Sequence, residues 1–188
     1  MESSRGTEPS ESRPCGWLAG PAFGAQSLPA ADSPVWDQIE TRWPVADDDP
    51  SWRHAGFQPD NWAERGAGLP SAHKSLEAYI EASQAYQAHV VRFAAEHMRT
   101  RKFEPCWGAF AFHLVDPFAG IGFGLLDASR RPKRALEALA RAFKPTRVIV
   151  EPLGFEPDRP FGVLQKPDVT FGAGLVSVNG DPATSGRG

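Results

Sequence analysis

The strongest constraint on the fold is a short apolar run that precedes a glycine-rich loop and an amphipathic segment. The run Gly108–Asp116 reads GAFAFHLVD and is apolar at consecutive positions. Such a run predicts a strand that is covered on both sides, as in a parallel sheet, although a buried helix could show the same pattern at greater length. Asp116-Pro117 would close this strand at its carboxyl end.

A helix is predicted after the loop. Pro132 suits a first helical position. Apolar residues then recur at helical spacing, at Leu136, Leu139, Ala140 and Phe143. Lys144-Pro145 would stop the helix, and a second apolar run, Val148–Val150, follows. The unit is therefore strand, loop, helix and apolar run.

The clearest helix is predicted over Ser71–Arg101. Its expected packing face consists of Leu76, Ile80, Ser83, Tyr86, Val90, Phe93 and His97, flanked by Tyr79, Val91, Ala94 and Met98. Acidic residues near its start and basic residues near its end suit the helix dipole. We expect a structural role for this helix, and the same for His89 and His97.

Composition narrows the classes of function. A chain of 188 residues with 41% apolar content can bury a core, and a net charge of −3 does not indicate a nucleic-acid partner. Cys15 and Cys106 are too few for a disulfide framework. No run approaches the roughly 20 apolar residues of a membrane helix. Residues 1–16 lack the apolar centre of a secretory signal, so we expect a disordered start and a cytoplasmic protein.

Four groups of residues carry a resemblance to a known family. They are Gly108, Phe112–Asp116, Phe123–Asp127 and Pro132-Lys133. Their order resembles the eighth barrel strand and helix of family 2 glycoside hydrolases, the β-galactosidase, β-glucuronidase and β-mannosidase group. There the pattern is Gly, Trp-Gln-Leu-Asn-Asp, a loop, Trp-Ser-Val-Leu-Asp and Pro-Lys. Phe112 replaces a tryptophan here, and His113-Leu114-Val115 replaces Gln-Leu-Asn.

A second segment resembles the seventh strand of the same family. That strand ends in Ser-Glu-Phe-Gly, commonly followed by Ala-Gln-Ser-Leu-Pro, and its glutamate is the nucleophile. This chain matches over Phe23–Pro29 but reads Pro21-Ala22 before it, so Ala22 occupies the nucleophile position. The resemblance implies that the two segments are neighbouring parallel strands.

The fold class implied is α/β, a partial (β/α)8 TIM barrel comprising the last two βα units, followed by an incomplete β segment. The barrel portion would span residues 17–150. Residues 151–188 would be a linker and the start of a β-sandwich-like tail, with strand-like alternation over Asp168–Asn179.

The function implied is that of a fragment of a retaining β-glycosidase acting on carbohydrate, without a cofactor or metal. Retaining hydrolysis needs two carboxyl groups, and the acid/base strand of the family lies upstream of this chain, so we expect no activity from the chain alone. The residues expected to bind substrate are Gln26 at the cleft rim, Phe112 as an apolar platform, His113, and Asp116, which would bind sugar hydroxyls or order the loop. An inward core position for Phe112 is an equal alternative to the platform. A catalytic pair of Asp116 with Asp127 is disfavoured, because Asp127 suits a loop or first-turn position.

The segment Asp32–Pro70 shows no sustained periodicity and predicts a long loop. Trp36, Trp43, Trp52 and Trp62 would pin this loop to the barrel, or less favourably wall a sugar cleft. The acidic run Asp47–Asp49 is expected to be solvated surface. Alternatives for the whole chain are a non-catalytic carbohydrate-binding or scaffold remnant and a helical interaction module. Uncovered barrel edges would favour self-association.

Overall fold

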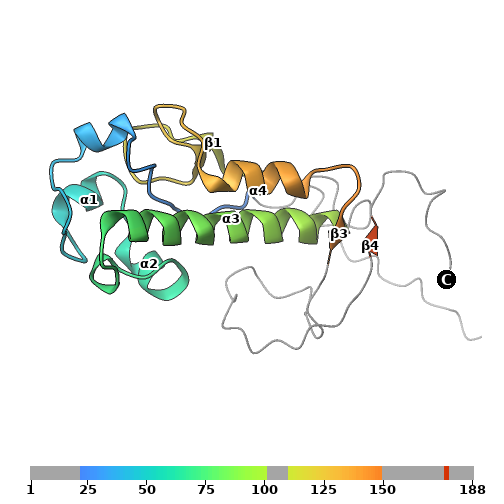
Figure 1. Cartoon of the computed structure of the whole chain (residues 1–188), viewed down its shortest axis with the longest axis horizontal. Coiled ribbons are helices and arrows are strands. Elements are labelled where there is room, and N and C mark those ends of the chain that lie inside the picture. Colours follow the sequence, from blue (N-terminus) through green and yellow to red (C-terminus); the bar gives the residue numbers. More distant parts are fainter. Residues whose placement is uncertain (1–21, 101–109, 150–175, 178–188) are drawn as a thin grey trace, which may run out of the picture.

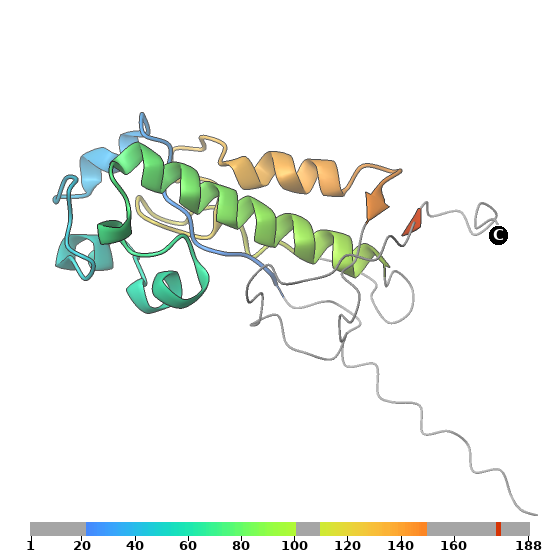
Figure 2. The same ribbon diagram turned by 60° about the horizontal axis from the view of Figure 1, so that its bottom comes forward.

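The computed structural model describes residues 22–100, 110–149 and 176–177. The expected N-terminal segment 1–16 lies outside these residues, as does the tail 151–188 except for two positions. Two helices, α3 (Leu76–Thr100) and α4 (Arg134–Ala142), lie side by side in both ribbon views (Figures 1 and 2). No helix among the described residues has the length and apolar character required to span a bilayer.

Helix α3 confirms the long predicted helix, but it begins at Leu76 and not at Ser71. The Ser75 hydroxyl accepts a hydrogen bond from the Ala78 amide (3.2 Å), which caps the helix at this point. The buried face is rotated from the expected one, because Tyr86, Val90 and Phe93 are only partly buried. Its buried members are Tyr79, Ile80, Ser83, Gln84, Gln87, Val91, Ala94, Ala95, His97 and Met98.

Helix α4 is also confirmed, with a later start than predicted. Lys133 is its N-cap residue, so Pro132 precedes the helix and does not open it. The buried residues of α4 are Ala135 and Ala142, whose small side chains let the helix approach the alanine-rich face of α3. Phe143, expected on the packing face, is half exposed just after the helix. The Gln84 side chain of α3 accepts a bond from the Arg134 amide (3.2 Å) and so ties the two helices together.

The two segments that carry the family resemblance lie against each other. Phe23 forms a parallel bridge with Ala111: its amide donates to the Phe110 carbonyl (3.0 Å), and its carbonyl accepts from the Phe112 amide (2.9 Å). Farther along the chain, Ser27 forms an antiparallel bridge with Gly122. The expected adjacency of these segments is therefore confirmed.

The predicted strand is shorter than the apolar run and has an unexpected partner. Strand β1 (His113–Val115) pairs in parallel with β2 (Gly124–Leu126), a strand within the segment expected to be a loop. The prediction that both faces of this strand are covered is wrong. Ala111 packs on the cluster formed with α3 and α4, whereas Phe110, Phe112 and Leu114 are more than half exposed, because no described element covers that face.

A second, two-stranded sheet lies at the far end of the helix pair. Strand β3 (Val148–Ile149) follows α4, as the apolar run indicated, and pairs antiparallel with β4 (Val176–Ser177). Strand β4 falls within the segment Asp168–Asn179 that was expected to contain strands; the rest of that segment lies outside the described residues.

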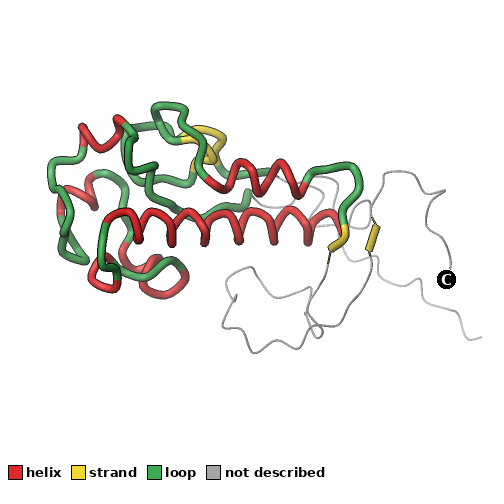
Figure 3. Tube along the Cα trace, in the orientation of Figure 1, coloured by secondary structure: helices red, strands yellow, loops and turns green. Residues whose placement is uncertain are grey.

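The long loop contains short helices that the sequence analysis missed. They are η1 (Pro34–Gln38), α1 (Pro50–His54), α2 (Pro59–Arg65) and η2 (Pro70–Ala72), seen as red turns in Figure 3. Each begins with a proline, which suits a first helical position. The acidic run is not merely solvated: Asp49 caps α1 by accepting from the Ser51 and Trp52 amides, and Asp47 accepts from the Ser71 amide and hydroxyl.

The tryptophans of this loop are core residues. Trp36, Trp52 and Trp62 are buried and Trp43 packs beside them. The Trp52 ring stacks on the Tyr79 ring of α3 (centroids 6.3 Å apart, planes 2° apart), and Trp62 meets the same tyrosine edge-on at 5.2 Å. The interpretation that the tryptophans pin the loop is confirmed, and burial rules out the alternative that Trp36, Trp52 and Trp62 wall a cleft.

Tyr79 should report on this cluster in an alkaline titration. Burial, and secondarily the Asp47 carboxylate, raise the pKa of the Tyr79 phenol far above its usual value of 10.0. The stability that the neutral phenol contributes is therefore complete below pH 10 and falls as the pH rises above it, because only the unfolded chain loses the proton there. As the pH is raised, the wild type should gain more phenolate absorbance than Tyr79→Phe only at the pH at which the wild-type chain unfolds. Ionisation of Tyr79 in the folded chain would contradict this.

Candidate functional site

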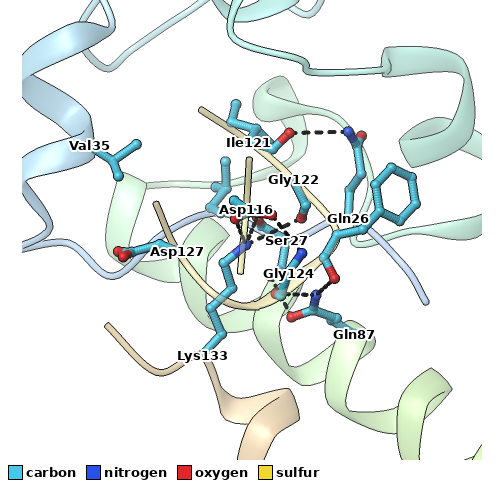
Figure 4. Close-up of polar contacts among 12 residues, drawn as sticks. Gln26, Ser27, Val35, Gln87, Asp116, Ile121, Gly122, Gly124, Asp127 and Lys133 are labelled. Atoms are coloured by element: carbon cyan, nitrogen blue, oxygen red, sulfur yellow. Dashed lines mark hydrogen bonds and ion pairs between the residues drawn. The ribbon is translucent and has the colours of Figure 1, made fainter. Parts of the chain in front are cut away.

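The candidate residues surround the loop 116–124, between the carboxyl end of β1 and the start of β2. Figure 4 shows that polar side chains from the segment Gln26–Ser27, from α3 and from the N-cap of α4 converge on this loop. The carboxyl ends of parallel strands are where ligands bind in open α/β sheets and barrels. The geometry decides which of these groups could meet a ligand.

Asp116 is buried and paired. Its Oδ2 accepts from the Lys133 ammonium (2.7 Å), and its Oδ1 accepts from the Gly124 amide (2.6 Å). Both side chains of the ion pair are 1% exposed. Gly122 permits this arrangement, because a Cβ at that position would overlap the Asp116 carboxylate. Of the two roles expected for Asp116, ordering the loop matches the structure, and contact with sugar hydroxyls does not.

Lys133 completes the arrangement by donating to two carbonyls as well. Its ammonium lies 3.2 Å from the Ser27 carbonyl and 3.3 Å from that of Gly122. Burial lowers the pKa of the Lys133 ammonium, and the charge of Asp116 acts in the opposite direction. One lysine thus joins the segment that resembles strand seven, the loop after β1 and the start of α4.

Gln87 plays a similar role from the centre of α3. Its Oε1 accepts from the Ser27 hydroxyl (2.7 Å). Its Nε2 donates to three main-chain carbonyls, those of Ala25 (3.0 Å), Phe123 (3.1 Å) and Gly124 (3.0 Å). Ser83 and Gln84 bind the next residue of the segment, since the Leu28 amide donates to the Ser83 hydroxyl and its carbonyl accepts from Gln84.

Gln26, expected at a cleft rim, is instead buried and used within the fold. Its amide nitrogen donates to the carbonyls of Gly56 (2.7 Å) and Ile121 (3.2 Å). Its amide oxygen accepts from the Trp62 indole (2.8 Å). The Gln26 side chain therefore connects the segment Asp32–Pro70, called here the tryptophan-rich loop, to Ile121 in the loop before β2. Its amide nitrogen and its amide oxygen are both used in these bonds.

Asp127 orders the turn before α4, in agreement with the loop position expected for it. Its carboxylate accepts from the Ser33 hydroxyl (2.6 Å) and from the Arg131 amide (2.9 Å). The turn places Arg130 at a φ of +63°, a conformation that non-glycine residues seldom adopt. Because both aspartates are buried and hydrogen-bonded, the pair Asp116 and Asp127 offers no free carboxylate for catalysis.

Phe112 and His113, at the start of β1, have ring centroids 4.3 Å apart with their planes tilted by 34°. Phe112 is half exposed and meets the Phe123 ring edge-on at 5.3 Å. His113 is partly buried, and its Nδ1 is a buried side-chain atom without a hydrogen-bond partner among the described residues. Ala22, at the position matched to the nucleophile, is exposed at the edge of the described chain. Within that chain, no group of His, Cys, Asp and Glu is arranged to hold a metal ion.

Sequence reasoning missed the residues that do most of the bonding in this region. Lys133 was noticed only as part of a Pro-Lys pair, and Gln84 and Gln87 were not singled out. The available signal was their position: Gln84, Gln87 and Val91 follow Ile80 at the three- and four-residue steps of a buried helix face. A polar residue at such a position indicates a buried hydrogen-bond network.

Comparison with known proteins finds similarity in structure alone. The sequence matches no protein-family model, and no curated protein is detectably similar to it in sequence. Among solved structures, the chain is similar to a β-D-mannosidase from Dictyoglomus thermophilum, with a TM-score of 0.57 and 19% identity. The match covers 70% of this chain and 16% of the mannosidase chain. The chain therefore shares the fold of a small part of that enzyme.

Proposed function

We propose that this chain corresponds to the last two strand–helix units of a family 2 glycoside hydrolase barrel and that it does not cleave glycosides by itself. The observation that carries the proposal is the parallel pairing of Phe23 with Ala111. It joins the two segments whose residues resemble strands seven and eight of that family. The structural similarity to part of a β-D-mannosidase supports the same assignment.

The expected lack of hydrolysis rests on the chemistry of the retaining reaction. That reaction needs a nucleophile and an acid/base carboxyl group about 5–5.5 Å apart. The position matched to the nucleophile is Ala22, and the nearby carboxylates of Asp116 and Asp127 are held by Lys133 and by Ser33. A parent enzyme with both carboxyl groups would hydrolyse β-linked glycosides; this chain would supply only scaffold.

The test is to assay the chain with three substrates, nitrophenyl β-mannoside, β-galactoside and β-glucuronide. We expect no turnover above the buffer rate from the wild-type chain. Ala22→Glu should also remain inactive, because it restores one carboxylate of the two that the reaction requires. Turnover by the wild-type chain, reproduced in preparations from a host without β-glycosidases, would contradict the proposal.

A second candidate is carbohydrate binding without cleavage. The exposed aromatic rings of Phe110 and Phe112 favour it, since aromatic faces can stack on sugar rings. Calorimetric titration with mannose, galactose and glucuronate tests this candidate, and Phe112→Ala should abolish any binding. The alternative of a helical interaction module gains no support, because the apolar side of α3 is packed against α4 and the tryptophan-rich loop.

A further inference from the structure

We draw no further inference here: the strongest candidate, the surface patch made by the exposed apolar side chains of Phe110, Phe112 and Leu114 at β1, carries none, because nothing in the described part of the chain shows what covers it.

Discussion

Replacement of Lys133 by methionine is expected to lower the free energy of unfolding by about 3–5 kcal/mol, the usual loss when one partner of a buried ion pair is removed. The Asp116 carboxylate would stay 1% exposed with its cation gone. The carbonyls of Ser27 and Gly122 would lose a donor as well. Urea denaturation followed by far-ultraviolet circular dichroism measures the change.

The second partner and an exposed pair provide the controls. Asp116→Asn should be similarly destabilising, and the loss in the double variant should be clearly smaller than the sum of the two single losses, since the sites interact directly. Arg131→Ala removes the exposed pair with Asp32 and should cost far less than Lys133→Met, because water screens an exposed ion pair. If Lys133→Met cost no more than Arg131→Ala, the buried pair would not have the structural importance assigned to it.

Replacement of Gln87 by leucine should have an effect of comparable size. The substitution keeps the approximate volume but leaves the Ser27 hydroxyl and the carbonyls of Ala25, Phe123 and Gly124 without this partner. Each buried polar group that loses its partner costs about 1–3 kcal/mol, so a total of about 3 kcal/mol or more is expected even without full additivity.

Two further variants separate hydrogen bonding from packing at this position. Gln87→Glu keeps the shape and replaces the donor nitrogen with an acceptor, so it should be at least as damaging as leucine. Gln38→Leu changes an exposed glutamine in the same way and should have little effect. Equal midpoints in urea for Gln87→Leu and Gln38→Leu would show that the hydrogen bonds to the loop are dispensable.

The sequence predicted α3 and α4 because long amphipathic patterns are independent of distant contacts. It placed the buried side of α3 only approximately: Ile80, Ser83 and His97 are buried as expected, whereas Gln84 and Gln87 were not included. Gln87 bonds to residues up to 62 positions away, and such partners are not visible in the local sequence. The short helices of the tryptophan-rich loop have too few residues for periodicity. Their signals were local, a serine or aspartate followed by a proline, as at Ser33-Pro34 and Asp49-Pro50.

The sequence predicted where the candidate residues lie better than it predicted what their side chains do. The two motif segments are neighbours, and Asp116 does follow a strand at its carboxyl end. Whether a polar residue there faces solvent depends on its hydrogen-bond partners. Spacing in the sequence does not show that Lys133 is the partner of Asp116, or that Trp62 is the partner of Gln26. The exposure of Phe110, Phe112 and Leu114 was missed for another reason: an apolar run shows that a strand can be buried, not that an element is present to bury it.

The polar stripe of α3, formed by Ser83, Gln84 and Gln87, fixes where this helix docks along its own axis. Apolar helices can slide past each other by one turn, about 5.4 Å, and still bury similar surface. Here such a slip would break the hydrogen bonds of these three side chains to the main chain of Leu28 and Gly124, whose positions along the helix axis are fixed by the rest of the fold. The helix therefore sets its own alignment, and the preceding connection can change in length without moving it.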